Sequence, residues 1–445
     1  MNVIKNKINS KSQNLHYYVG GIILISVIVF FFFLRDSQII TEDSSVKTII
    51  VAGHISEAHQ RIIESFNKKQ KGKIQIKTVN LSFQKFSTDE QKELFARFLR
   101  GESDKIDIFL VDQIWTPRFA KWSEPLEGQF KYQERQNFIT AGLEACSYEE
   151  HLVAVPLFID VAMMYYRDDL LKKLPEYETI KKKLENSITW EDFIQLGLES
   201  KKYGHPFYTF QGKAYEGLMC SFIELMGSQN MTLYKNHKIQ LQSPQAKKAL
   251  QLLVDLVNTY KLSSNRVLEF EENQSYDFFI KKDGFFLRGW PNLGWHFKPD
   301  SYERKKISNL KKTLLPHFGG QRKTSILGGW NLMVSKFSNN KREAIEVLKY
   351  WTSEESQKTM YEIGGFLPAN KNLYEEEKYI EKYPELKFYQ EIISKGFHRP
   401  FIKNYTKISG IISVFINMAV TNKISVPEAL KQAEEKINSD LLMIQ

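Results

Sequence analysis

At 445 residues, the chain is longer than one hydrophobic core usually supports, so two domains are expected. Hydrophobic residues make up 42% and charged residues 26%, which is typical of a globular protein. The formal net charge of +10 comes from scattered lysines with interleaved acids, a pattern that indicates a solvated surface and not a nucleic-acid groove. Two cysteines, Cys146 and Cys220, are too few for a disulfide scaffold, and either a single pair or two buried thiols would fit their apolar contexts.

The start of the chain predicts a membrane anchor. Tyr17–Leu34 is an uncharged stretch of 18 residues, which as a helix reaches about 27 Å and spans a bilayer. Lysines before this span place residues 1–16 in the cytoplasm and the bulk of the chain outside. We predict a single-pass anchor at 17–34 in the cell membrane and a linker at 35–45, with cleavage in Ser37–Ser45 as the alternative. No cysteine follows the span, which excludes a lipoprotein anchor.

From Val46 the pattern predicts alternating strands and helices. Three β-branched or alternating runs are expected to be strands: Val46–Gly53, Lys73–Val79 and Asp107–Asp112. Helical spacing of apolar residues predicts helices at Ser56–Gln70 and Gln91–Arg100 between them. This order indicates a parallel sheet with right-handed crossovers. Ligands of such sheets gather at the carboxyl ends of strands, which is where Asp112 falls.

One stretch, His151–Leu171, is expected to join two lobes. The apolar run Leu152–Val155 is predicted to be a strand that Pro156 stops, because proline cannot donate to a central ladder. A second apolar run, Val161–Tyr166, is expected to open the other lobe. Asp160 then lies where the lobes face each other, a common place for a small ligand.

The rest of the chain predicts mainly helices. Helix N-caps are expected at Thr189, Ser243, Thr352 and Ser425. Tyr215–Ser228 is expected to be an apolar helix. Phe278–Trp295 is expected to carry a strand into a loop rich in glycine and tryptophan, and Ile326–Ser335 to be a further strand.

The fold class expected from these elements is α/β with two lobes. Crossings near Pro156, Gly328 and Pro368 predict a hinge made of several strands. The expected boundaries are 46–158 plus 330–366 for lobe I, and 159–329 plus 367–445 for lobe II.

Seven segments in this order resemble one protein family. They are VPLFIDVAMMYYRDDLL, TWEDF, QGKAYEGL, FFLRGWPN, LGGWNLMVS, GGFLPAN and HRPFIKNYTKIS. Together they are similar to the extracellular solute-binding proteins of sugar ABC importers, family 1, most closely the trehalose/maltose-binding type. The resemblance covers nearly everything from Val46 onward. It implies a periplasmic-binding-protein fold whose two lobes close on a mono-, di- or oligosaccharide and deliver it to ABC permease subunits.

The resemblance also implies which residues bind the sugar. In the family, carboxylates and an arginine hold sugar hydroxyls, and aromatic rings stack on pyranose faces. The positions that match by motif are Asp112, Asp160, Trp290, Gly329, Trp330 and Arg399. The match extends to Glu57, Phe158, Phe83 and Tyr215. No cofactor, metal, nucleic acid or catalytic residue is implied.

Each of these residues also has a purely structural interpretation. Asp112 could cap the following helix, and Asp160 could satisfy backbone amides of the hinge. Trp290 and Trp330 could be core residues. Arg399 could pair with a surface acid. The family's polar or basic ligand contact after the second strand has no clear counterpart in Ser82–Gln91, so the identity of the sugar stays open.

Two other functions fit the same residues. Asp112 and Asp160 could serve as the acid and base of a glycosidase, although a hinge does not suit geometry that must stay fixed. The sequence carries no nucleophile elbow, HExxH, phosphate loop or dinucleotide fingerprint. A sensing module that passes closure to a membrane signalling partner is the other alternative. The prediction is a binding protein and not an enzyme.

Overall fold

The computed structural model describes residues 46–82, 85–298, 301–307 and 309–442. The predicted anchor at 17–34, together with residues 1–16 and the whole linker at 35–45, lies outside these residues. Within the described ranges, no helix is both long and apolar enough to cross a membrane.

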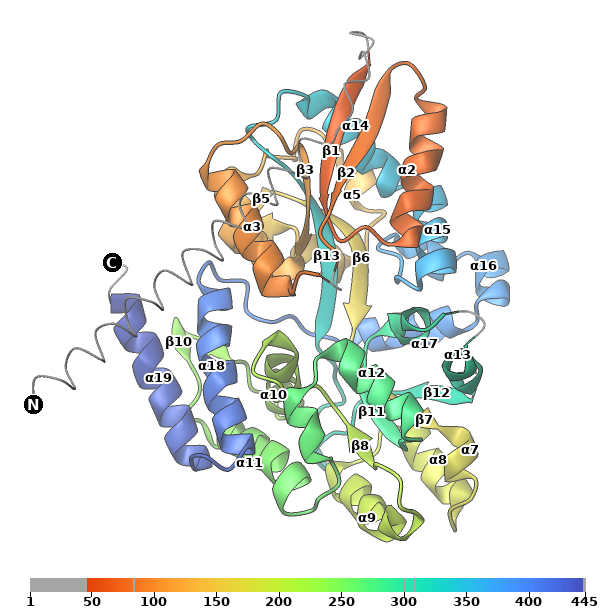
Figure 1. Ribbon diagram of the computed structural model, residues 1–445, viewed down its shortest axis with the longest axis vertical. Coiled ribbons are helices and arrows are strands. Elements are labelled where there is room, and N and C mark those ends of the chain that lie inside the picture. Colours follow the sequence, from red (N-terminus) through yellow and green to blue (C-terminus); the bar gives the residue numbers. More distant parts are fainter. Residues whose placement is uncertain (1–45, 83–84, 299–300, 308, 443–445) are drawn as a thin grey trace, which may run out of the picture. The chain divides into compact units, whose positions relative to one another are not determined.

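The first sheet has the strand order β2–β1–β3–β13–β6 (Figure 1). Its strands are β2 (Ile74–Asn80), β1 (Lys47–Gly53), β3 (Ile108–Asp112), β13 (Leu327–Val334) and β6 (Val155–Val161). β1 and β3 are parallel, as the strand–helix order predicts, because a helical crossover returns the chain in the same direction. β13 is antiparallel to both β3 and β6, so the sheet is mixed.

The second sheet has the order β12–β7–β11–β8 (Figure 1). Its strands are β12 (Leu310–Thr313), β7 (Met163–Arg167), β11 (Phe286–Gly289) and β8 (Tyr208–Thr209). Two short pairs lie apart from both sheets: β4 (Ser147–Tyr148) with β5 (His151–Leu152), and β9 (Tyr234–Lys235) with β10 (Lys238–Ile239).

Helices surround the sheets and form most of the second half of the chain. Before β11 the α-helices are α2 (Glu57–Lys69), α3 (Thr88–Arg100), α4 (Thr116–Phe119), α5 (Tyr132–Arg135), α6 (Thr140–Glu144), α7 (Asp168–Leu171), α8 (Tyr177–Glu185), α9 (Trp190–Ser200), α10 (Glu216–Ser228), α11 (Pro244–Asn258) and α12 (Glu272–Lys281). After it they are α13 (Tyr302–Ile307), α14 (Lys341–Trp351), α15 (Glu354–Gly364), α16 (Glu377–Lys382), α17 (Glu385–Ser394), α18 (Tyr405–Val420) and α19 (Val426–Leu442). Short 3₁₀ turns are η1 (Gln113–Trp115), η2 (Ala120–Trp122), η3 (Lys201–Tyr203), η4 (Asn265–Glu269), η5 (Pro291–His296) and η6 (Lys371–Tyr374).

Most of the predicted helix starts are confirmed. The Thr189 and Ser243 side chains accept the backbone N–H three residues on, and Pro244 takes the first position of α11. The backbone N–H of Glu428 likewise donates to the Ser425 hydroxyl, at 3.4 Å. The predicted cap at Thr352 is wrong by one residue. Ser353 caps α15, and the Thr352 hydroxyl instead donates to Leu348 O of the preceding helix.

The predicted break at Pro156 is wrong. β6 runs through Pro156 to Val161 and stays in the first sheet throughout. β6 is an edge strand, where a residue without an N–H is tolerated. The pairing register between β6 and β13 also shifts next to Pro156, which lies opposite Asn331. The chain changes sheets only at Ala162, before β7 begins.

The predicted strand start at Phe278 is also wrong. Phe278–Lys281 is the last turn of α12, and the strand is Phe286–Gly289. A short apolar run cannot be assigned to helix or strand by periodicity alone. Both cysteines are buried as free thiols, one of the two alternatives left by the sequence.

The chain passes from the first sheet to the second at the end of β6, beside two other segments of the chain. β6 leads directly into β7, and the Ile159 N–H donates to Leu367 O at 3.1 Å. The start of β13 is tied to the segment before Arg399, since the Leu327 N–H donates to Phe397 O at 2.9 Å. The end of β6 and the start of β13, which pair through Val161 and Leu327, therefore lie beside the segments around Leu367 and Phe397.

Candidate functional site

Neighbouring strands of the first sheet bring several predicted site residues together. Trp330 lies opposite Asp112 in the β3–β13 pair and opposite Phe158 in the β13–β6 pair. Gly328 lies opposite Asp160. Because opposed residues of an antiparallel pair have Cα atoms about 5 Å apart, residues distant in sequence become neighbours here.

Arg399 adds a buried positive charge at this place. Its guanidinium lies 3.6 Å from the Asp112 carboxylate and donates to Glu216 at 2.9 Å. The Tyr405 hydroxyl donates to the same Glu216 oxygen at 2.7 Å. Arg399 Nε is buried, with no hydrogen-bond partner among the described residues. A buried donor left unpaired is costly, so this N–H is suited to a ligand atom or a water molecule.

The two aspartates have raised pKa values. Burial, together with the Asp112 carboxylate, raises the pKa of Asp160 to about 8, and the charge of Arg399 opposes this shift. Burial also raises the pKa of Asp112 to about 6, against the opposing effects of Arg399 and of the hydrogen bond from the Ile114 N–H. Asp160 Oδ1 is buried and unpartnered within the described structure. At pH 7 the site therefore offers a mostly protonated carboxyl beside a mostly ionised one, a hydrogen-bond donor beside an acceptor.

Trp290 comes from the end of β11 in the second sheet. Its ring lies over the Arg288 guanidinium, 4.4 Å from the ring centroid, and its Nε1 donates to Glu272 at 3.4 Å. A Cβ placed on Gly328 would meet the Trp290 ring at 3.1 Å and the Asp160 Cβ at 3.3 Å. Side chains from both sheets therefore converge on Gly328, and a larger residue there would push them apart.

Trp330 and its neighbours form the first-sheet wall of the same place. The Trp330 ring is partly buried and packs edge-on against Trp115, with centroids 5.4 Å apart. Gly329 has φ +136°, and a Cβ there would lie 2.5 Å from Phe158 O, so only glycine allows β6 and β13 to approach this closely. The Phe158 ring is buried against Phe366, with centroids 4.6 Å apart, and is a core residue here.

The remaining predicted residues are less closely tied to this cluster. Tyr215 precedes the first residue of α10, Glu216, and burial beside Glu272 raises its pKa well above the usual value. Glu57 is at the first position of α2 with its side chain 74% exposed, and it pairs with Arg61 at 3.8 Å. Phe83 lies outside the described residues.

Three residues of the cluster were not predicted from the sequence. They are Glu216, which pairs with Arg399, Glu272, which accepts from Trp290, and Arg288, which lies under its ring. Glu216 and Arg288 fall inside the motifs QGKAYEGL and FFLRGWPN. The signal was therefore present, although sequence gave no reason to choose these positions within the motifs. Among the described residues, no group of His, Cys, Asp and Glu side chains gathers in a way that could hold a metal ion.

Comparison with known proteins identifies the family. A family model of bacterial extracellular solute-binding proteins matches residues 61–387, more than half of the chain. The chain belongs to this family. The resemblance carried by the seven motifs is thus confirmed. The family comprises binding proteins and not enzymes, and its description places the bulk of the chain outside the cytoplasm.

Relatives of this solute-binding protein cover most of its length. A probable ABC transporter-binding protein of Deinococcus radiodurans is 25% identical over 356 residues, 79% of this chain and 83% of the relative. Maltose-bound MalE3 of T. maritima matches with a TM-score of 0.79 and 26% identity, covering 88% of this chain and 99% of that one. The GacH receptor of Streptomyces glaucescens, solved unliganded and with acarbose, matches with a TM-score of 0.75 and 20% identity, over 89% and 98% of the two chains. The fold is therefore the two-lobed α/β fold of periplasmic binding proteins.

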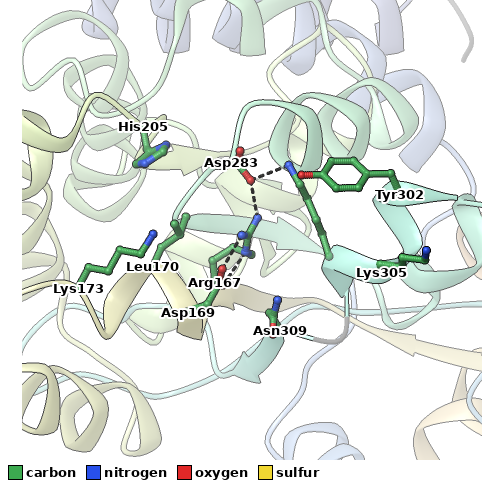
Figure 2. Close-up of a pocket in the computed structure, with 10 residues that line it drawn as sticks. Arg167, Asp169, Leu170, Lys173, His205, Asp283, Tyr302, Lys305 and Asn309 are labelled. Carbon is green, nitrogen blue, oxygen red and sulfur yellow. Dashed lines mark hydrogen bonds and ion pairs between the residues drawn. The ribbon is translucent and has the colours of Figure 1, made fainter.

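A separate cavity lies in the second lobe of the solute-binding protein. Its volume is about 440 Å³, and Figure 2 shows Arg167, one of its lining residues, between Asp169 and Asp283. The full lining is Arg167, Asp169, Leu170, Lys173, His205, Asp283, Tyr302, Lys305, Lys306 and Asn309. None of the predicted site residues lines it. Its acids are engaged by basic neighbours, since Arg167 and Lys306 both lie 2.8 Å from Asp283.

Proposed function

We propose that this solute-binding protein captures a mono-, di- or oligosaccharide between its two lobes and delivers it to an ABC permease. The proposed site is the cluster of Asp112, Asp160, Trp290, Trp330 and Arg399 with Gly329 beneath it. Tyr215, Glu57, Phe158 and Phe83 are proposed only as peripheral contributors. The lobes are proposed to divide at 46–158 plus 330–366 and 159–329 plus 367–445.

The observation that carries this proposal is the pair of unsatisfied buried groups at the convergence of the two sheets. Among the described residues, Arg399 Nε has no acceptor and Asp160 Oδ1 has no partner, while the Arg399 guanidinium lies beside the carboxylates of Asp112 and Glu216. A sugar hydroxyl is both donor and acceptor, so it can satisfy groups of either kind. The carbohydrate ligands of the solved relatives support the same class of solute.

The residue types suit the two kinds of surface on a sugar. Hydrogen bonds to ionised groups contribute about 1.5–3 kcal/mol each, against about 1 kcal/mol for neutral pairs, which fits Asp112 and Arg399 at the polar edges. Trp290 and Trp330 offer flat apolar plates with little rotamer entropy to lose, which fits the C–H faces. A few such contacts give binding near −8 kcal/mol, a micromolar dissociation constant, after the costs of association.

The remaining part of the proposal concerns location. The apolar segment 17–34 would tether the chain as a single-pass anchor and keep the binding lobes near the permease. The name of the Deinococcus relative, a probable transporter-binding protein, supports the permease as partner. Mass spectrometry of the mature N-terminus tests the anchor, because a protein that begins after Leu34 has no anchor.

The test of function is a thermal-shift screen of the full-length protein against mono-, di- and oligosaccharides, with product analysis of every hit. A sugar at one hundred times its dissociation constant should stabilise the fold by about 2.7 kcal/mol. A shift with the sugar recovered intact is the expected result. No shift with any carbohydrate, or recovery of cleaved sugar, would overturn the proposal.

Variants of two tryptophans test the location of the site. Trp290→Ala and Trp330→Ala should abolish measurable sugar binding in calorimetry while the far-UV circular dichroism stays unchanged. Trp122→Ala is the matched control, since Trp122 is also partly buried but packs against Phe119, outside the cluster. Unchanged affinity in both site variants would show that neither ring stacks on the sugar.

A further inference from the structure

Arg288 is a fully enclosed cation in the second lobe. Its side chain has 0% exposure, and its guanidinium donates to both carboxylate oxygens of Glu224, at 2.7 and 3.4 Å. The remaining nitrogen donates to the Gln211 side-chain oxygen at 3.2 Å. The Gln211 amide nitrogen donates in turn to Ser275 Oγ at 2.7 Å and to Arg288 O at 3.0 Å. Every nitrogen of this guanidinium therefore has a partner, and its plane is held from several elements.

The Trp290 indole lies over this guanidinium. The guanidinium carbon lies 4.4 Å from the ring centroid, within the range of a cation–π contact. The backbone of Trp290 is held as well, since its N–H donates to Tyr276 Oη at 3.1 Å and its carbonyl accepts from Tyr165 Oη at 2.7 Å. Gly328 meets the far edge of the ring. The ring is thus fixed from beneath and along its edge, while the residue stays only partly buried.

Stability by itself does not explain a charge in this position. A buried ion pair loses much of its Coulomb gain to desolvation, and well-packed apolar residues of similar volume often replace such a pair without loss. Lysine would also satisfy Glu224 but has no planar face to stack against an indole. The feature that distinguishes arginine here is the flat cation beneath Trp290.

We propose that Arg288 is a positioning residue that sets the plane of the Trp290 indole for stacking on the bound sugar. Glu224 and Gln211 hold the guanidinium, and the guanidinium holds the ring. This inference rests on the proposed sugar-binding function, because Trp290 acts on the ligand and Arg288 acts through Trp290.

The test compares Arg288→Lys with Arg167→Lys in the full-length protein. Arg167 is a matched control, because it is also a buried arginine held by ion pairs, in this case with Asp169 and Asp283, but it lines the separate cavity of Figure 2. The first readout needs no ligand. Subtracting the near-UV circular dichroism spectrum of Trp290→Phe from that of the wild type gives the contribution of Trp290, called the Trp290 band. This band is present only where the indole is held in a fixed orientation.

The second readout is the affinity for maltose by calorimetry. Arg288→Lys should lose the Trp290 band and bind maltose about tenfold more weakly, while Arg167→Lys keeps both. If Arg288→Lys does not fold, the double variant Arg288→Met with Glu224→Leu replaces it, because this change removes both charges together. The same losses are expected from it.

The outcomes separate this inference from the proposed function. If the wild-type protein binds no maltose, the inference is judged by the Trp290 band alone. An unchanged Trp290 band in Arg288→Lys then overturns the inference. If wild type binds maltose, a variant that binds equally well overturns it whatever the band shows. Equal losses in Arg167→Lys also overturn it, since they would reflect a general effect of removing a buried arginine.

Discussion

Arg288 and Arg399 are both buried arginines near the candidate site, and they differ in how completely their neighbours satisfy them. Each nitrogen of Arg288 has a partner, supplied by Glu224 and Gln211. Within the described part of the chain, Arg399 Nε has no hydrogen-bond partner, and neither has Asp160 Oδ1. A closed network is complete without a ligand, whereas an open one retains bonds for a ligand to make. The difference teaches that a buried charge alone is no reason to propose a binding site, whereas we propose one where unpaired buried groups of opposite kind lie beside each other.

The largest effect is expected from Arg399→Met. The substitution leaves Asp112 and Glu216 without their buried counter-charge, which typically costs about 3–5 kcal/mol of unfolding free energy. The loss should be larger at pH 8.5 than at low pH, because the aspartates hold fewer neutralising protons at the higher pH. Guanidinium chloride unfolding at that pH measures it.

The control for this prediction is Arg118→Met, which removes a more exposed arginine that pairs with Glu93. Its cost should stay below about 1 kcal/mol. A cost that small for Arg399→Met would show that Arg399 is not the counter-ion of the cluster.

A smaller effect is expected from Gly329→Ala, which tests the backbone beneath the open network. Gly329 has φ +136°, and its added Cβ would lie 2.5 Å from Phe158 O, so β6 and β13 must separate. The unfolding free energy should fall by about 1–3 kcal/mol. Gly410→Ala is the control, because Gly410 lies in α18 with open space around it, and alanine there should add about 0.5–1 kcal/mol. Equal values for the two variants would contradict the close approach of the strands.

The last prediction concerns the change in unfolding free energy per pH unit, which Asp160→Asn should remove. Asp160 has a folded-state pKa of about 8, above its unfolded value of 3.8, so the folded state binds the extra proton between these values. Its contribution to stability is therefore complete below pH 4 and is lost as the pH rises through 8, by about 1.4 kcal/mol per pH unit at most. Between pH 5.5 and 7.5 the variant should become progressively more stable relative to wild type in urea unfolding.

Asp192→Asn is the control for this pH series. The hydrogen bond from Lys183 lowers the pKa of Asp192, so both its folded and unfolded values lie below the tested range. Its difference from wild type should not change with pH. Parallel curves for Asp160→Asn and wild type would mean that Asp160 is ionised throughout and that the open network is more polar than its burial indicates.

Local pattern was sufficient for much of the fold. The order β1–α2–β2–α3–β3 follows from apolar periodicity, and the starts of α9 and α11 follow from the caps Thr189 and Ser243. Errors arose where neighbours decided the outcome. Pro156 continues a strand because that strand is at an edge of the sheet. Phe278 belongs to the last turns of α12, and the short apolar run around it could not be assigned to helix or strand from the sequence.

The predictions for the candidate site likewise succeeded in part. The motifs and the family resemblance singled out Asp112, Asp160, Trp290, Trp330 and Arg399, and each of these residues has contacts within one cluster. Glu57 was a weaker match to the family, and it is exposed and pairs with Arg61. Sequence supplies residue types, but whether a carboxylate meets a guanidinium depends on which strand ends lie side by side.

The sequence by itself therefore determined the family, the two α/β lobes and the candidate residues, because these depend on local propensity and on motifs in a given order. Only the tertiary structure decided that Glu216 pairs with Arg399, that Arg288 lies beneath Trp290, and that Arg399 Nε has no partner among the residues the structure describes. These relations join residues far apart in the chain. Their energies come from distance and burial, which no local pattern encodes.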